Sequence, residues 1–265
     1  MASFSVVNNI ASQNAQSNLA LTNTGLNKAL GRLSSGFRIN QSGDDAAGLA
    51  VANTYRNDIA ILNQGIRNAN DGMSVLQIKD SALANIATVL DRMATLATQA
   101  ASDAGEADIA KLSSEFNTLT TEIDREAAVA GLTAASTAFS VFVSASNGTI
   151  AGTMAGVETA DLGITQVTFT SVAQAQTALT QVKAAVSTLA GVQNSVGTLQ
   201  NRLSFAVSLS SSQVVNTQAA ESRIRDANIA EESANMTKFN ILSQAGVAAL
   251  AQANQASSSV LGLLR

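Results

Sequence analysis

Two pairs of neighbouring carboxylates are the residues of this chain whose types and spacing could do chemistry. Asp44-Asp45 is a paired carboxylate of the kind that general acid–base catalysis uses. The pair directly precedes the small apolar run 46–51, so we interpret it as the N-terminal cap of a helix. Carboxylates at that position accept unpaired backbone N–H groups and complement the helix dipole. Glu231-Glu232 lies in an expected helix, where neighbouring positions face different sides, so it makes a poor catalytic pair.

The residue types that are missing exclude most other chemistries. The chain has no His and no Cys, so it can form no Ser-His-Asp triad, no Cys nucleophile, no zinc site and no disulfide. The remaining charged cluster, Arg223 and Arg225 beside Asp226, is expected to be solvated or to lie between subunits. We therefore expect no enzyme activity, no catalytic residue, no metal site and no cofactor.

Charge and hydropathy exclude two classes of partner. The formal net charge of −4 and the pI near 4.8 argue against nucleic acid, which requires a basic face. No stretch approaches the roughly 18 apolar residues of a membrane span, so no membrane partner is expected. The first nine residues have neither a basic region nor a continuous apolar run, which distinguishes them from a Sec-type signal peptide. These residues alone favour a cytoplasmic protein.

The composition favours long, closely packed helices. Apolar residues make up 46% of the chain but aromatic residues only 3%, and Pro is absent. Small and unbranched side chains let helix backbones approach each other, and without Pro no residue forces a helix to break. We therefore expect helices to hold any functional residue in place.

Charge is missing from both ends of the chain. Residues 1–27 and 239–264 contain no charged side chain, although both segments carry apolar residues at helical spacing. These residues are Ile10, Leu19, Leu26, Leu30 and Leu33 at one end, and Met236, Phe239, Leu242, Ala245, Ala249, Ala253 and Val260 at the other. One interpretation is two weakly helical, frayed termini. The other is two helices whose uncharged faces are buried against other protein and order only on assembly.

Three interior segments repeat apolar residues at alternating steps of three and four. This period specifies helices that wind around each other with knobs in holes. The first segment holds Leu76, Leu83, Leu90 and Ala97 with Ile86, Met93 and Ala100; the second holds Ile109, Leu112, Phe116, Leu119, Ile123 and Glu126; the third holds Val182, Leu189, Val196 and Leu203 with Ala178, Ala185, Val192, Leu199 and Ala206. We expect these residues to form a core and to bind no cofactor.

The segment 131–170 has a different pattern. Residues 137–143 alternate apolar and small polar side chains, and Asn147-Gly148 follows, which predicts a β-hairpin. Residues 167–170 could add a short strand. Asn147-Gly148-Thr149 also fits an N-glycosylation sequon, but we interpret it as the turn.

Two long motifs, in the same order, closely resemble the signatures of bacterial flagellins. The first is Leu33-Ser34-Ser35-Gly36-Phe37-Arg38-Ile39-Asn40, followed by Asp44-Asp45-Ala46-Ala47-Gly48-Leu49-Ala50. The second is Ser222-Arg223-Ile224-Arg225-Asp226-Ala227, which leads into 240–246, 250–255 and the ending 260–265. The resemblance covers residues 1–126 and 172–265.

The resemblance implies a mainly α fold: a long coiled-coil-like helical bundle with a small β-hairpin region, plus N- and C-terminal helices paired in a coaxial core. Segments 1–43 and 222–265 would line the filament channel, 44–130 and 172–221 would form the bundle, and 131–171 would be the short outer region. The chain is then a short flagellin without large outer domains. The Phe-Asn-Gly that usually follows the third helix is absent, and Ala130-Gly131-Leu132 stands nearby.

The resemblance also implies a function and partners. The chain would be a structural subunit that polymerises with itself into the flagellar filament for swimming motility. It would leave through the flagellar type III export apparatus with an export chaperone, and assemble with the filament cap and hook–filament junction proteins. Its location would be extracellular, in the flagellum, which replaces the cytoplasmic expectation.

Two sets of residues are expected to carry these interactions. The apolar residues of the ends would pack in the filament core: Leu19, Leu26, Leu30, Leu33, Phe239, Leu242, Leu250, Val260, Leu261 and Leu264. Arg92, Leu96 and Glu115 resemble the patch of flagellins that stimulate Toll-like receptor 5, although Asp91, Ala94 and Thr95 depart from that pattern. Arg92 falls just outside the heptad positions, and Leu96 next to them would leave apolar surface exposed as a subunit interface requires.

Three other classes of protein remain as alternatives at this point. A hook–filament junction protein shares both flagellin ends, but the C-terminal run 250–255 and the short middle favour flagellin proper. A soluble enzyme would have to use one of the acidic pairs. A membrane-active helical protein would carry a Lys/Arg-rich polar face, which these helices do not.

Overall fold

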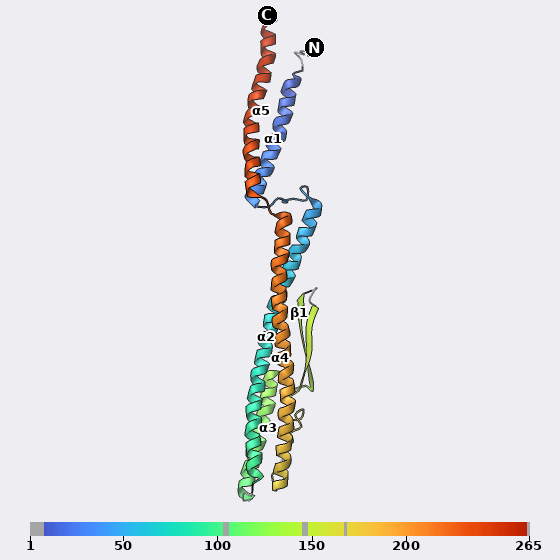
Figure 1. Ribbon diagram of the computed structural model, residues 1–265, viewed down its shortest axis with the longest axis vertical. Coiled ribbons are helices and arrows are strands. Elements are labelled where there is room, and N and C mark those ends of the chain that lie inside the picture. The colour runs from blue at the N-terminus through green and yellow to red at the C-terminus, as the bar shows by residue number, and fades with distance from the viewer. Residues whose placement is uncertain (1–7, 103–105, 145–147, 167–168, 264–265) are drawn as a thin grey trace. The chain divides into compact units, whose positions relative to one another are not determined.

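The computed structural model describes residues 8–102, 106–144, 148–166 and 169–263, and it is mainly helical (Figure 1). Its elements, in chain order, are α1 (Ile10–Ser35), α2 (Ala46–Ala100), α3 (Glu106–Ala130), β1 (Ser136–Ser144), β2 (Gly148–Ala155), α4 (Val172–Arg225) and α5 (Ile229–Leu263). The predicted mainly α fold with one small hairpin is confirmed.

The chain divides into two compact units. The terminal unit comprises residues 1–58 and 216–265, and the central unit comprises residues 59–215. The long helices α2 and α4 each contribute to both units, because their residues 46–58 and 216–225 belong to the terminal one. The three-part division at residues 43, 130, 171 and 222 that the sequence suggested stays a prediction.

The core of the central unit is formed by α2, α3 and α4, and it follows the predicted repeat. In α2 the seven predicted core residues from Leu76 to Ala100 are all completely buried. Phe116 and Ile123 of α3 are also completely buried, while Leu112 and Leu119 pack at the margin. In α4, Leu203 and the earlier predicted positions are buried, and Ala206 is partly buried. The repeat therefore identified the core of three helices that pack together.

The hairpin packs against α2 and α4 through glycines. β1 and β2 pair antiparallel, with Phe139 opposite Gly152 and an irregularity between Phe142 and Ser144. Gly65 of α2 lets the backbone of the hairpin approach so closely that an added Cβ would lie 1.4 Å from the Val143 carbonyl oxygen. Gly152 likewise makes room for Leu199 of α4. The predicted hairpin is confirmed, although the expected turn residue Asn147 lies outside the described residues.

Two polar contacts hold the hairpin on the helices. The Asn68 side chain of α2 donates to the Phe142 carbonyl at 3.2 Å. The Arg202 guanidinium of α4 donates to the Ala151 carbonyl at 3.0 Å. Each strand is thus tied to a different helix of the bundle.

The expected short strand at 167–170 is not formed by the residues that the structure describes. Residues 167–168 lie outside them, and Phe169 and Thr170 are not in a strand. Phe169 instead places its ring 5.1 Å from that of Phe116 in an edge-to-face arrangement, and its amide donates to the Ser113 hydroxyl at 3.0 Å. Packing into the helical core therefore replaces strand pairing here.

The C-terminal end of α3 is capped by a buried lysine. Lys79 of α2 is 8% exposed, and its ammonium donates to the carbonyls of Ala130 and Gly131. Gly131 has a φ of 63°, a left-handed conformation that suits glycine. Burial lowers the pKa of the Lys79 ammonium. This cap involves Ala130 and Gly131, which stand near the position where the resemblance led us to expect Phe-Asn-Gly.

The close approach at Gly65 generates a prediction with a matched control. Gly65→Ala should destabilise the chain by about 2 kcal/mol or more, because the new methyl group would collide with a backbone carbonyl that cannot move alone. Gly191→Ala, in an open part of α4, should stabilise it by about 0.5–1 kcal/mol, since nothing lies within contact distance. Urea unfolding followed by circular dichroism measures both. Equal stability of the two variants would contradict the packing of the hairpin on α2.

Candidate assembly site

The two flagellin-like motifs meet at the two helix breaks of the terminal unit. α1 ends at Gly36, whose φ is 75°, and the next residue, Phe37, forms an isolated antiparallel bridge with Asp226. The Arg38 amide donates to the Arg225 carbonyl at 2.6 Å. The break between α1 and α2 is thereby joined by backbone hydrogen bonds to the break between α4 and α5. We call residues 36–45 and 225–228 the elbow.

Side chains reinforce the elbow. The Arg225 guanidinium lies 4.1 Å from the centre of the Phe37 ring and 3.7 Å from the Glu221 carboxylate. The Arg38 guanidinium donates to the Ile224 carbonyl at 2.9 Å. The expectation of a solvated cluster is wrong for Arg225, because its side chain is 16% exposed and stacks on an aromatic ring of its own chain.

Asp44 and Asp45 are structural, and the predicted helix cap is confirmed. Asp45 accepts from the amide of Gly48 at 2.8 Å and thereby caps the start of α2. Asp44 pairs with the Lys28 ammonium of α1 at 2.7 Å. The hydrogen bond from Lys28 lowers the pKa of the Asp44 carboxyl; burial opposes this shift, and the amides of Asn40 and Gln41 add to it. Both carboxylates are thus committed to holding helix ends.

Glu231 and Glu232 do point to different faces. Glu231 is exposed, whereas Glu232 is 7% exposed and binds the Arg32 guanidinium of α1 at 2.9 Å. A buried carboxylate left without its cation would be strongly destabilising, so Arg32 and Glu232 bind as a unit. The pair fixes one end of the contact between α1 and α5.

Helices α1 and α5 run antiparallel, and the positions that contact each other repeat every seven residues in both helices. The bonded residues at the two ends of the contact show the antiparallel direction. At the far end from Arg32, the Asn9 amide group donates to the Ala253 carbonyl at 3.0 Å. The facing residues of lowest exposure are Ser12, Ala15, Leu19, Thr22, Leu26, Ala29 and Leu33 on α1 and Glu232, Met236, Phe239, Ser243, Gly246, Leu250 and Ala253 on α5. Within the described residues, the contact between α1 and α5 is made mainly by small and medium-sized side chains.

Two glycines that sequence reasoning missed bring the helices together. An added Cβ at Gly25 would lie 2.7 Å from ring atoms of Phe239, and one at Gly246 would lie 3.1 Å from the Leu19 side chain. Each helix thus offers one glycine to a large side chain of the other. The seven-residue spacing of Leu19 with Leu26 and of Phe239 with Gly246 was the signal that could have found this arrangement.

The expected filament-core residues divide into three groups. Leu19, Leu26, Leu33, Phe239 and Leu250 are half-buried between the helices. Leu30 and Leu242 are 54% and 43% exposed, because the helix contact passes through Ser243 rather than Leu242. The side chains of Val260 and Leu261, and Leu264 as a whole, lie outside the described residues.

The outward faces of this helix pair carry exposed apolar side chains, and residues 1–27 and 239–264 add no charge to them. Ile10, Leu21, Leu30, Ile241 and Val247 are each more than half exposed. Ala29 is the one completely covered apolar residue among the described side chains of α1, and α5 has none in its described part. The pair therefore buries little of its apolar surface within one chain.

Arg92 and Glu115 are brought together, but Leu96 is not exposed beside them. The Arg92 guanidinium donates twice to Glu115, at 2.9 and 2.6 Å, across the α2–α3 contact, and both side chains are exposed. Leu96 is 1% exposed. The expectation of exposed apolar surface at Leu96 is wrong because α3 and α4 cover α2 on two sides, so positions next to the heptad repeat are buried too.

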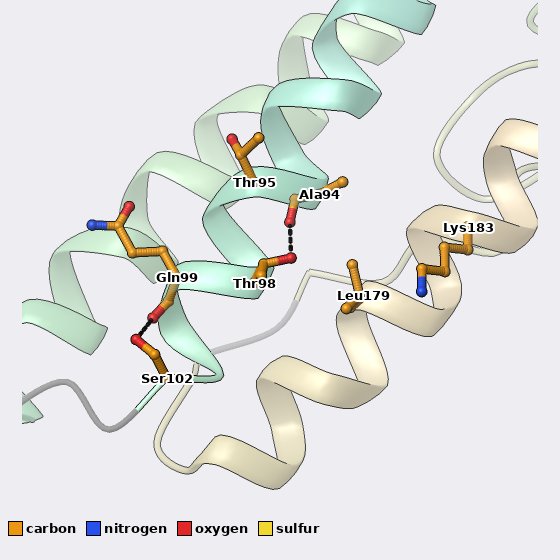
Figure 2. Close-up of a pocket in the computed structure, with 7 residues that line it drawn as sticks. All are labelled: Ala94, Thr95, Thr98, Gln99, Ser102, Leu179 and Lys183. Atoms are coloured by element: carbon orange, nitrogen blue, oxygen red, sulfur yellow. Dashed lines mark hydrogen bonds between the residues drawn. The ribbon is translucent and has the colours of Figure 1, made fainter.

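An open groove of about 680 Å³ lies between the C-terminal part of α2 and the start of α4 (Figure 2). Its lining includes Ala94, Thr98, Leu179 and Lys183. The Thr98 hydroxyl donates to the Ala94 carbonyl at 2.8 Å, one turn earlier in the same helix. The Ser102 hydroxyl likewise donates to the Gln99 carbonyl at 2.6 Å, so both hydroxyls are engaged by the backbone of α2 and its end. Across the described parts of the chain, no cluster of three acidic side chains could hold a metal ion, and no helix is apolar and long enough to span a membrane.

Long paired helices with uncharged segments, in which Asp44, Asp45 and Glu232 serve as caps and ties, define a helical structural protein that assembles with other protein. Family models agree with this class. The bacterial flagellin N-terminal helical region matches residues 6–133, and the bacterial flagellin C-terminal helical region matches residues 172–264. The chain belongs to the bacterial flagellin family.

Similar proteins extend over nearly the whole chain. A flagellin of Halalkalibacterium halodurans is 35% identical over 97% of this chain and 98% of its own. The flagellar filament 33 kDa core protein of Treponema phagedenis is 36% identical with the same coverage. A flagellin of Bacillus subtilis is 33% identical, again over 97% and 98% of the two chains. The chain is therefore a short flagellin, a structural subunit of the flagellar filament and not an enzyme.

Acidification should test the Lys28–Asp44 tie. Because the folded-state pKa of Asp44 is lowered, its stabilisation is present above the unfolded-state pKa of about 3.9 and is lost as pH falls through the folded value. Asp44→Asn filaments should be weaker at neutral pH than the wild type, but should lose less stability on acidification. Sedimentation of filaments across the acidic range measures this.

Glu122→Gln is the matched control for Asp44→Asn. The pKa of the Glu122 carboxyl is also lowered, by hydrogen bonding to Arg125, but Glu122 is exposed on α3. Its substitution should leave the acid profile of filaments unchanged. An Asp44→Asn profile parallel to that of the wild type would contradict the role of the tie.

Proposed function

We propose that this subunit polymerises by burying the open faces of α1 and α5 against neighbouring copies in the filament core. The observation that carries the proposal is the set of exposed apolar side chains on α1 and α5, most of which lie in the uncharged segments 1–27 and 239–264. A soluble helix normally places Lys and Glu on such a face. Uncharged polar residues cost less to bury than charges do, which suits a surface that is covered on assembly.

Hydroxyl groups on these helices support the same proposal. The Thr22 hydroxyl donates to the Asn18 carbonyl at 2.8 Å, and the Thr24 hydroxyl donates to the Ala20 carbonyl at 2.9 Å. A hydroxyl already bonded to its own helix loses less when water is removed. Burying the exposed part of a leucine such as Leu30 would stabilise the contact by roughly 1 kcal/mol per subunit. Repeated along α1 and α5, such contributions favour a polymer.

The filament core then takes residues from both ends of the chain. Leu30 and Leu242 would face neighbouring copies, while Leu19, Leu26, Leu33, Phe239 and Leu250 would join α1 to α5 within the chain. Val260, Leu261 and Leu264 would extend this packing toward the C-terminus. The segments 1–43 and 222–265 would line the channel, 44–130 and 172–221 would form the bundle outside it, and 131–171 would be the outer region.

Family membership supports the remaining steps of the pathway. The subunit would be exported by the flagellar type III apparatus with an export chaperone, and would polymerise outside the cell below a filament cap. Hook–filament junction proteins would connect it to the hook. A junction role for this chain itself is not favoured, because its relatives are flagellins and filament core proteins.

The exposed Arg92–Glu115 pair is proposed as a second contact surface on the central unit. An arginine held by two hydrogen bonds is fixed in position before it meets a partner, which favours an interface hot spot. Its partner in the filament would be a neighbouring subunit. On the free monomer the same pair would be available to Toll-like receptor 5.

Leu242→Asp tests the role of the terminal helices. The side chain is 43% exposed in the single chain, so the substitution should leave the central unit folded. It should abolish polymerisation, because a charge buried at every subunit interface costs several kcal/mol. Seeded growth followed by sedimentation and electron microscopy measures assembly, and circular dichroism measures folding.

Ile78→Asp is the control for Leu242→Asp. Ile78 is 58% exposed on α2 beside Lys79 and Asp80 in the sequence, so an added charge there should be tolerated. Normal filaments from Leu242→Asp, or loss of filaments from both variants, would argue against burial of Leu242 in particular.

Arg92→Ala should slow filament growth several-fold while leaving the unfolding free energy of the monomer within about 0.5 kcal/mol, because exposed ion pairs contribute little to folding. Arg125→Ala is the control: Arg125 is equally exposed and pairs with Glu122 and Glu126 of its own helix. Seeded elongation rates and a Toll-like receptor 5 reporter assay measure the two roles separately. Equal elongation by both variants would contradict the interface, and an unchanged reporter signal would contradict receptor binding.

A further inference from the structure

Helix α4 contains long uncharged segments in the interior of the sequence. Between Val172 and Ala220 its charged residues are Lys183 and Arg202, so residues 203–220, like residues 184–201, contain no Asp, Glu, Lys or Arg. The facing helix α2 carries charges at ordinary density. In composition, the segment 203–220 resembles residues 1–27 and 239–264, whose open faces are proposed to be covered in the filament.

The segment has one packed face and one open face. Leu203 and Ser210 are completely buried in the chain. On the opposite face Phe205 is 77% exposed, Leu209 is 51% exposed and Val215 is 66% exposed. An exposed phenylalanine costs more to leave in water than any other side chain of this segment. We call the surface formed by these three exposed residues the Phe205 face.

The Phe205 face is continuous along the helix. Phe205 and Leu209 are four residues apart and therefore neighbours on the helix surface, and the face extends over about 15 Å to Val215. The polar residues between Phe205 and Val215 are serines and Gln213, and the Ser212 hydroxyl donates to the Ser208 carbonyl at 3.0 Å. That hydroxyl is satisfied within the helix, as those of Thr22 and Thr24 are. The face can therefore be dehydrated at low cost.

Other exposed apolar residues of the central unit do not form such a face. Ile78, 58% exposed, has Val75, 45% exposed, one turn before it, but these two residues lie between Asp71 and Lys79-Asp80 in the sequence. Val129, 59% exposed, follows Arg125 and Glu126 of the same helix at one-turn spacing. Isolated apolar residues among charges are normal on a soluble protein and require no partner. The Phe205 face differs because it holds three large apolar side chains within residues 203–220, which carry no charge, and the neighbouring Arg202 guanidinium is engaged by the Ala151 carbonyl.

We propose that the Phe205 face is a contact surface for a second copy of this chain within the filament. A filament subunit is surrounded by identical copies, and residues 203–220 share the uncharged composition of its assembling ends. The lack of Lys and Arg gives an anionic membrane or a nucleic acid nothing to attract. An open filament requires contacts between different surfaces of two copies, since a patch that pairs with itself would close a dimer. The Phe205 face thus meets another part of its neighbour.

This inference rests on the proposed assembly through α1 and α5, but it makes a separate claim. Phe205→Ser should leave the unfolding free energy of the monomer unchanged, because most of the ring is in water. It should raise the monomer concentration needed for growth about tenfold or more, since the loss of a buried phenylalanine weakens an interface by that factor. Ile78→Ser is the matched control and should assemble like the wild type.

A second measurement does not depend on the strength of assembly. The chain has no Cys, so Ser208→Cys places a single thiol beside Phe205, and Ile78→Cys places one on α2. A maleimide should label both monomers at similar rates. In assembled filaments, labelling at position 208 should fall at least tenfold, while labelling at position 78 continues.

The outcomes separate this inference from the function on which it rests. Filaments that form with position 208 still labelled at the monomer rate, together with normal growth of Phe205→Ser, would overturn the Phe205 face and leave assembly through α1 and α5 intact. If Leu242→Asp forms normal filaments while position 208 is protected, the proposed role of the terminal helices fails and the Phe205 face stands.

Discussion

The structure depends on one physical constraint: helical segments without charged side chains, such as 10–27 of α1 and 239–263 of α5, must cover their apolar faces with other protein. α1 and α5 cover each other on one side only, through a zipper of small residues, and leave Leu30 and Leu242 open. The central unit solves the same problem within one chain, because three helices and a hairpin surround its core. The core of the central unit is complete within one chain. The contact between α1 and α5 is covered on one side only, and we propose that polymerisation covers the other.

The acidic pairs suggest acid–base catalysis, but in the structure their carboxylates stabilise helices. Asp45 caps α2, Asp44 binds Lys28, and Glu232 binds Arg32. Asp44 and Asp45 take their donors from the N-terminal part of the chain, whereas Glu232 takes its donor, Arg32, from the opposite end of the sequence. The flagellin-like motifs, read as two separate strings of residues, meet in space as the Phe37–Asp226 bridge. The role of these motifs is to hold the two helix breaks together.

Sequence periodicity predicted the core of the central unit because buried helices must place apolar residues every three or four positions; Leu83 and Leu189 are examples. It failed where burial depends on more than one neighbour, as at Leu96, and where small residues make the contact. The search for apolar residues chose Leu242, whereas the helix contact uses Ser243 and Gly246, which hydropathy does not reveal. The bridge at Phe37 could not be predicted either, since backbone pairing between distant segments leaves no local pattern.

The two glycine contacts between α1 and α5 limit which substitutions the two helices can accept. A side chain at Gly25 has room only if Phe239 becomes smaller, and one at Gly246 only if Leu19 does. Sliding one helix by a heptad would lose both fits at once and would separate Arg32 from Glu232. Substitutions in the first helix are therefore acceptable chiefly when matched by substitutions in the last. The two segments lie at opposite ends of the sequence, but substitutions in one must be matched by substitutions in the other. The same constraint applies to chimaeras that join the N-terminal segment of one flagellin to the C-terminal segment of another.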